Sequence, residues 1–126
     1  MTIKIKRAYE KALPSDGCRV LVDRLWPRGI SKSEAHLEAW EKDLAPSTGL
    51  RKWYGHQPER WEAFKKRYRS ELAANPAVPE FLEKNKAQQV VTLVYAAREE
   101  AYSHALVLQE FLQKKRSGSP AGTTGA

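Results

Sequence analysis

Two largely apolar runs constrain the fold of this chain most: Val20 to Val22 and Val90 to Tyr95. Strands covered on both faces have this pattern, which is typical of parallel sheets enclosed by helices. A further strand is predicted over residues 2–6, where Ile3 and Ile5 alternate with polar residues. Because several helical patterns separate the two runs, the sequence predicts an α/β fold with a small, largely parallel sheet flanked by helices. This layering is Rossmann-like, but the dinucleotide fingerprint is absent from the sequence.

Capping signals and apolar spacing predict the helices. Ser31 with Glu34 forms a capping box for a short helix over residues 32–35. Ser47 begins a second helix, which Gly55 ends in the left-handed conformation that glycine adopts readily. The clearest helix opens at Pro58 and runs to about residue 74. Its apolar stripe consists of Trp61, Phe64, Tyr68 and Leu72. Two more helices are predicted over residues 79–86 and 103–115, whereas residues 37–44 fit either a helix or an irregular strand.

Length and composition predict one domain in the cytoplasm. The 126 residues suit a single domain over residues 1–116, and the Ser, Gly, Pro, Thr and Ala of residues 117–126 predict a disordered tail. The single cysteine, Cys18, excludes an internal disulfide and suits a reducing compartment. No signal-peptide core is present, and no apolar run approaches the ~20 residues that span a bilayer. We therefore expect no membrane partner, while the oligomeric state stays open.

The stretch from Val22 to Gly29 is the strongest candidate for a site. Its strand is expected over residues 19–26 and to end at Pro27, because proline cannot donate to a sheet. Ligands of open α/β sheets bind beyond the carboxyl ends of the strands. If the two apolar strands are parallel neighbours, eight residues meet in one crevice. These are Asp23, Arg24, Trp26 and Arg28 after the first strand, and Tyr95, Arg98, Ser103 and His104 after the second.

The arginines in this set predict an anionic guest, because guanidinium groups make bidentate contacts with phosphate and carboxylate. We expect Arg24, Arg28 and Arg98 to hold a small molecule that bears such a group. The remaining ligand contacts are expected from Trp26, Tyr95 and Ser103. If the protein also acts on this molecule, Asp23 would orient the arginines or serve as base, and His104 would donate the proton.

A purely structural alternative accounts for the same residues. In that interpretation Asp23 forms a salt bridge with Arg24 or Arg28, Trp26 fills the core and His104 caps a helix. His56 is expected to be a loop residue outside the site, and Cys18 a buried, inert thiol. The three histidines and the cysteine have no zinc-binding spacing, and the sequence lacks a P-loop and a G-x-S-x-G motif. No metal and no cofactor is therefore expected.

Two other function classes remain open. The formal net charge of +7 and the basic side of the Trp61 helix suit a nucleic-acid-binding module. The basic residues there are Arg60, Lys65, Lys66, Arg67 and Arg69, but Glu59, Glu62 and Glu71 dilute them. The other class is an interaction or oligomerisation module with tryptophans as anchors. Its anchors would be Trp26, Trp40, Trp53 and Trp61.

Several of these motifs together resemble the YeaO-like family, part of a bacterial group named domain of unknown function 488 (DUF488). The matching segments are Ser15-Asp16-Gly17, the block from Arg19 to Gly29, Leu44-Ala45-Pro46-Ser47, Leu50-Arg51 and His104-Ala105-Leu106. The resemblance covers about residues 1–113. It implies a compact α/β domain in the bacterial cytoplasm and no established activity. It also implies a suspected site at a strand end followed by proline, which is Asp23-Arg24 with Pro27 in this chain.

The chain departs from the YeaO-like pattern at three positions. Cys18 stands where an aromatic residue is common, which weakens any cysteine mechanism. Arg98 stands where lysine is common, so the charge is kept but Schiff-base chemistry is excluded. Ser103 replaces an asparagine before His104, so the role of that amide is performed by a hydroxyl or not at all.

Overall fold

A four-stranded sheet in which every strand pairing is parallel forms the centre of the molecule. The computed structural model describes residues 1–118. Of the tail expected over residues 117–126, residues 117 and 118 belong to the last helix, and the rest lies outside the described residues. The strand order is β1-β4-β2-β3. The strands are β1 (Thr2–Arg7), β2 (Cys18–Leu21), β3 (Ala39–Trp40) and β4 (Val90–Tyr95). The α-helices are α1 (Lys32–Ala35), α2 (Thr48–Tyr54), α3 (Trp61–Ala73), α4 (Ala77–Lys84) and α5 (His104–Gly118). The predicted α/β class and parallel sheet are confirmed.

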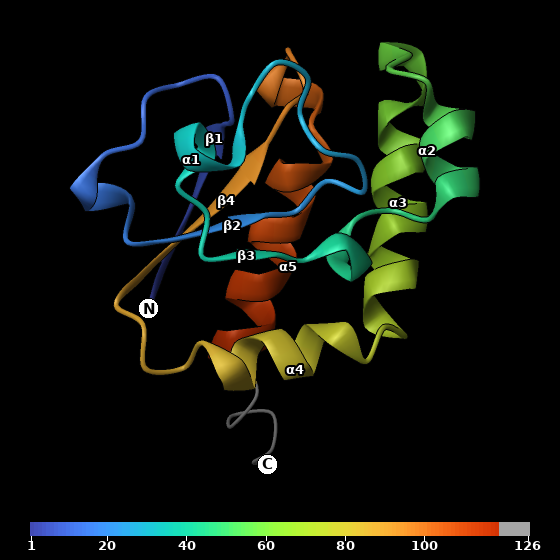
Figure 1. Cartoon of the computed structure of the whole chain (residues 1–126). Coiled ribbons are helices and arrows are strands. Elements are labelled where there is room, and N and C mark those ends of the chain that lie inside the picture. The colour runs from blue at the N-terminus through green and yellow to red at the C-terminus, as the bar shows by residue number, and fades with distance from the viewer. Residues whose placement is uncertain (119–126) are drawn as a thin grey trace.

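One face of the sheet packs against the long helices, with α5 lying along it and α3 beside α5 (Figure 1). Every second residue of a strand points to this face. Ile3 on β1, Val91 on β4 and Val20 on β2 do so, and all three belong to the apolar core between the sheet and the helices. All four residues of the predicted stripe on α3 are buried in this core, which confirms the stripe. The strands β2 and β4 are hydrogen-bonded neighbours, as the crevice hypothesis requires.

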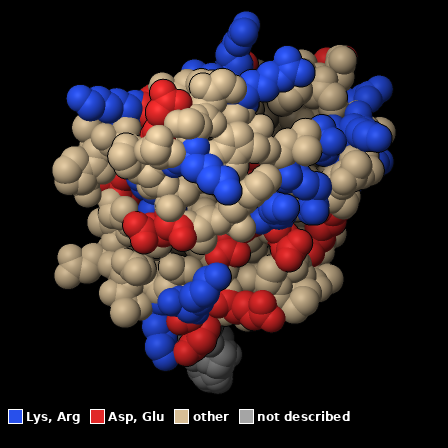
Figure 2. Space-filling model, viewed as in Figure 1, with Lys and Arg blue, Asp and Glu red and all other residues tan. Residues whose placement is uncertain are grey.

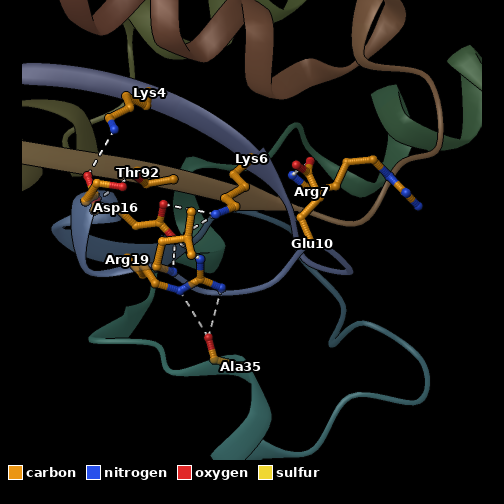
Figure 3. Close-up of polar contacts among 10 residues, drawn as sticks. Lys4, Lys6, Arg7, Glu10, Asp16, Arg19, Ala35 and Thr92 are labelled. Atoms are coloured by element: carbon orange, nitrogen blue, oxygen red, sulfur yellow. Dashed lines mark hydrogen bonds and ion pairs between the residues drawn. The ribbon is translucent and has the colours of Figure 1, made fainter.

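The opposite face of the sheet carries polar residues under a loop and the short helix α1. The Asp16 carboxylate lies 3.1 Å from Lys6 Nζ and 2.6 Å from Arg19 Nη1 (Figure 3). Arg19 also donates from Nε and Nη2 to the carbonyl of Ala35, at the end of α1. Gly17 follows with φ +64°, and a Cβ there would lie 2.5 Å from the Val90 carbonyl oxygen, so this turn requires glycine. Burial raises the pKa of Asp16, but the Leu13 amide, Lys6 and Arg19 outweigh it and the net pKa is lowered.

One sequence-based boundary is corrected and one ambiguity is resolved. β2 ends at Leu21 and does not continue to Trp26, although the Val22 amide still donates to Val94. The Asp23 side chain then accepts the Ala96 amide, so a side chain replaces the backbone ladder and the chain leaves the sheet. The ambiguous residues 37–44 contain the two-residue strand β3 and a 3₁₀ turn over Lys42–Leu44.

Candidate functional site

A cavity of about 570 Å³ opens where β2 and β4 end. Most of its lining comes from three segments: the loop after β2, the loop between β4 and α5, and α2 with the residues before and after it. Tyr9 after β1 and Phe64 on α3 complete the lining. Seven of the eight predicted site residues line it. These are Asp23, Arg24, Trp26, Arg28, Arg98, Ser103 and His104. The geometry therefore brings both predicted strand ends together, while the roles of the residues stay predictions.

Asp23 and His104 connect the two strand ends to each other. Asp23 Oδ2 accepts the Ala96 amide at 2.9 Å, and Oδ1 lies 3.2 Å from His104 Nε2. That nitrogen lies 3.0 Å from the Val22 carbonyl oxygen, which only accepts, so Nε2 carries the proton. Both side chains are largely buried, and within residues 1–118 Asp23 Oδ1 accepts no hydrogen bond. This geometry makes the pair a link between β2, β4 and the start of α5.

Within residues 1–118, the guanidinium groups at the cavity lack carboxylate partners. Arg24 donates from Nε to Pro46 O at 3.2 Å and from Nη2 to Ala45 O at 3.3 Å. Arg28 and Arg98 are exposed, as is Arg51 on α2. No ion pair within residues 1–118 involves any of these four arginines, so the salt bridge of Asp23 with Arg24 or Arg28 is not formed there. The carboxylates that line the cavity are those of Asp23 and Glu99.

The cavity also has a large apolar component. Of the five exposed large hydrophobic residues of the described chain, three line it: Tyr9, Leu25 and Tyr102. Trp26 is half-buried, donates from Nε1 to Ile30 O and packs edge-on against Trp40 with ring centroids 5.4 Å apart. Trp26 therefore forms part of the cavity wall and does not fill the core, contrary to the structural alternative.

Tyr95 and Ser103 are both buried where their strand and helix place them. Alternate residues of a strand point to the same face, so Tyr95 lies with Val91 and Leu93 on the helix-facing side of β4. Its ring is therefore in the core and does not line the cavity. Burial raises the pKa of Tyr95 to about 12. The Ser103 hydroxyl accepts the Ala105 amide at 3.1 Å at the start of α5, so it serves as a helix cap at the cavity wall.

Sequence reasoning missed the wall that α2 provides. Arg51 lies on this helix, and His56 follows its Gly55 C-cap in the left-handed region with φ +56°. His56 is a loop residue, as expected, but it lines the cavity, where the sequence did not place it. The predicted Ser47 cap and Gly55 stop did locate the helix, but nothing local in the sequence shows that it packs beside the strand ends.

Charge on the rest of the surface is mixed. Figure 2 shows both signs interspersed, with Lys and Arg gathered toward the upper right, where α2 lies in Figure 1. Some of these basic side chains make local contacts, since Arg67 lies 4.1 Å from the Trp53 ring centroid and Lys65 pairs with Glu62 at 3.2 Å.

The Cys18 thiol is buried, as expected, and burial raises its pKa. Within residues 1–118 no group of His, Cys, Asp or Glu is placed to hold a metal, and no helix is long and apolar enough to cross a membrane.

Comparison with known proteins gives a family model and close relatives. Residues 2–123 match the model DUF488-N3i, described as "Inactive DUF488-N3 subclade". "Uncharacterized protein Rv3073c" of Mycobacterium tuberculosis is 49% identical over 110 residues, which cover 87% of this chain and 92% of that protein. "Uncharacterized protein YeaO" of Escherichia coli K12 is 42% identical over 113 residues, covering 90% and 98%. No solved structure matches the chain. The predicted YeaO-like resemblance is confirmed.

Proposed function

The chain belongs to the DUF488-N3i family, the inactive DUF488-N3 subclade, and from this premise we propose that it binds an anionic small molecule in the strand-end cavity. The guest carries a phosphate or a carboxylate. The chain binds this guest without transforming it.

The observation that carries the proposal is the set of cavity arginines without carboxylate partners within residues 1–118. Arg28, Arg51 and Arg98 come from three different segments and line the same cavity. Like charges at one cavity repel each other, and an anion between them removes that repulsion with charge-assisted hydrogen bonds. Arg19, by contrast, has its own carboxylate partner in Asp16 and needs no guest.

Binding without catalysis is supported by the Asp23–His104 pair. A general base needs free reach to the proton that it abstracts. Asp23 Oδ2 accepts the Ala96 amide, and Asp23 Oδ1 is buried 3.2 Å from His104 Nε2. His104 Nε2 itself donates to Val22 O. The family description, an inactive subclade, agrees with this assignment. In the proposal both residues position the loops that carry the arginines.

A thermal-shift screen against phosphorylated and carboxylated metabolites, followed by calorimetry, tests the proposal. A ligand present at about 100 times its dissociation constant stabilises the native state by about 2.7 kcal/mol. We expect the shift in the wild type and its loss in Arg51→Ala and Arg98→Ala. Arg116→Ala is the matched control, because it removes one exposed guanidinium from the last turn of α5, outside the cavity. Binding that Arg116→Ala weakens as much as the cavity variants would reflect net charge only and would exclude this site.

A further inference from the structure

We infer that the guest is a phosphate monoester joined to a planar aromatic ring, with the chemistry of a nucleoside monophosphate. This inference rests on the proposed function and narrows it. Three features of the cavity carry it: its excess charge, its aromatic rim and the hydrogen bond that joins the rim to the segment of Arg28.

The charge of the lining favours phosphate over carboxylate. The described lining contains four guanidinium groups and two carboxylates. With the histidines counted as neutral, the lining therefore has two positive charges in excess. A phosphate monoester carries about −1.5 to −2 at pH 7, whereas a carboxylate carries one negative charge. A phosphate monoester therefore neutralises the lining, and a single carboxylate leaves it cationic. The planar guanidinium groups also match the several oxygens of a phosphate.

The rim of the cavity is suited to a ring. Tyr9 is 48% exposed and Tyr102 is 39% exposed, and both line the cavity. Tyrosine rings that remain open to solvent at a cavity are surfaces on which a base stacks. Both rings are held in place: Arg7 lies 5.1 Å from the Tyr9 ring centroid, and Trp61 packs edge-on against Tyr102 with centroids 5.7 Å apart. A flexible aliphatic guest would gain little from such fixed flat surfaces.

One hydrogen bond joins the rim to the backbone of the segment that carries Arg28. The Tyr9 hydroxyl donates to the Arg28 carbonyl at 3.0 Å, which ties the segment after β1 to the segment after β2. Tyr9 and Arg28 line the same cavity, so one guest in it has both a ring and a guanidinium within its site. The volume of about 570 Å³ is within the range of about 300–1,000 Å³ that is usual for small-molecule pockets.

Calorimetry with matched probes tests the inference. The probes are the four ribonucleoside 5′-monophosphates, their nucleosides, and ribose 5-phosphate, which keeps the phosphate but lacks the ring. We expect at least one monophosphate to bind tenfold or more tightly than both its nucleoside and ribose 5-phosphate. Tyr9→Ala should weaken that monophosphate by about tenfold, the effect of losing one stacking contact, and leave ribose 5-phosphate unchanged. Tyr9→Phe keeps the ring and loses only the hydrogen bond to the Arg28 carbonyl, so it should weaken that monophosphate less than Tyr9→Ala does. Arg98→Ala should weaken both phosphates.

The outcomes separate the inference from the proposed function. If ribose 5-phosphate binds within threefold of every monophosphate, the ring is not recognised, and the inference is overturned while anion binding stands. If carboxylates bind and phosphates do not, the inference is overturned in the same way. If no phosphate or carboxylate binds, the proposed function fails and the inference fails with it. Tyr102→Ala is a second variant on the rim, so a poorly folded Tyr9→Ala does not decide the result.

Discussion

Strand β2 has an aspartate–arginine pair at each end, and the two pairs are used differently. Before and within the strand, Asp16 and Arg19 are buried together, and Lys6 completes a network in which each charge has a partner. After the strand, Asp23 turns to the Ala96 amide, and Arg24 joins three other arginines at an open cavity. The same residue types thus hold the fold at one end and leave cationic groups available at the other. Partnering, more than residue type, separates a structural cluster from a candidate binding site.

The largest effect on stability is expected at the buried cluster of Asp16, Arg19 and Lys6. Asp16→Ala removes the carboxylate that faces Lys6 and Arg19 and leaves the buried Arg19 guanidinium unpaired. Breaking a buried ion pair from one side costs about 3–5 kcal/mol. We expect the free energy of unfolding, measured by urea denaturation, to fall by that amount. Asp43→Ala, at an exposed position, is the control and should change it by less than about 0.5 kcal/mol. Equal losses in both variants would show that the cluster does not hold the fold.

Asp23→Ala should have the next largest effect. The variant removes the acceptor of the Ala96 amide and the neighbour of His104, but the site borders a cavity that admits water. Hydrogen bonds to charged groups contribute about 1.5–3 kcal/mol, and we expect a loss of unfolding free energy in that range. Asp23→Asn keeps an oxygen acceptor for Ala96 and should lose less. An Asp23→Asn protein as unstable as Asp23→Ala would assign the effect to the charge near His104 and not to the amide contact.

Local signals account for the elements that sequence reasoning predicted correctly. The Ser31–Glu34 capping box, the Gly55 stop and the apolar stripe on α3 each depend on residues within a few positions of one another. The same holds for β1 and β4, whose patterns are complete within six residues each. The polar cluster of Asp16 with Lys6 was not predicted, because its members come from different segments and are buried against expectation for charged residues.

The candidate site was predicted in part for a related reason. The rule that ligands bind at strand ends brings Arg24, Arg28 and Arg98 together once β2 and β4 are neighbours. The third wall depends on how α2 packs, which no local pattern records, so Arg51 and His56 were missed. The end of β2 was also missed, because it depends on a contact between Asp23 and Ala96, 73 positions apart.

Acid should weaken the buried cluster of Asp16, Arg19 and Lys6. The pKa of folded Asp16 is lowered, since the Leu13 amide, Lys6 and Arg19 outweigh the effect of burial. The ionised carboxylate therefore stabilises the fold above its ordinary pKa of about 3.9, and this contribution is lost as the pH falls through the lower folded pKa. We expect the difference in unfolding free energy between the wild type and Asp16→Asn to be constant from pH 7 to about 5 and to shrink below about pH 4. Urea denaturation at each pH measures it, and a difference that stays constant down to pH 2.5 would contradict the assignment.

The smallest effect is expected at the cavity arginines after β2. The sign of the change in unfolding free energy there is the sharpest test of the comparison. Arg28 and Arg98 are exposed and have no carboxylate partner within residues 1–118, so they contribute little to the unliganded fold. In Arg28→Ala/Arg98→Ala the unfolding free energy should stay within about 0.5 kcal/mol of the wild type, or rise because repulsion among the cavity arginines is reduced. Arg19→Ala, which also removes a guanidinium, should lose several times as much, because it leaves Asp16 buried with one cation fewer. Urea denaturation of the ligand-free proteins decides between the two. A loss above about 1 kcal/mol in the double variant would mean that the cavity arginines stabilise the fold as Arg19 does. They would then be structural residues and not cations available to bind a guest.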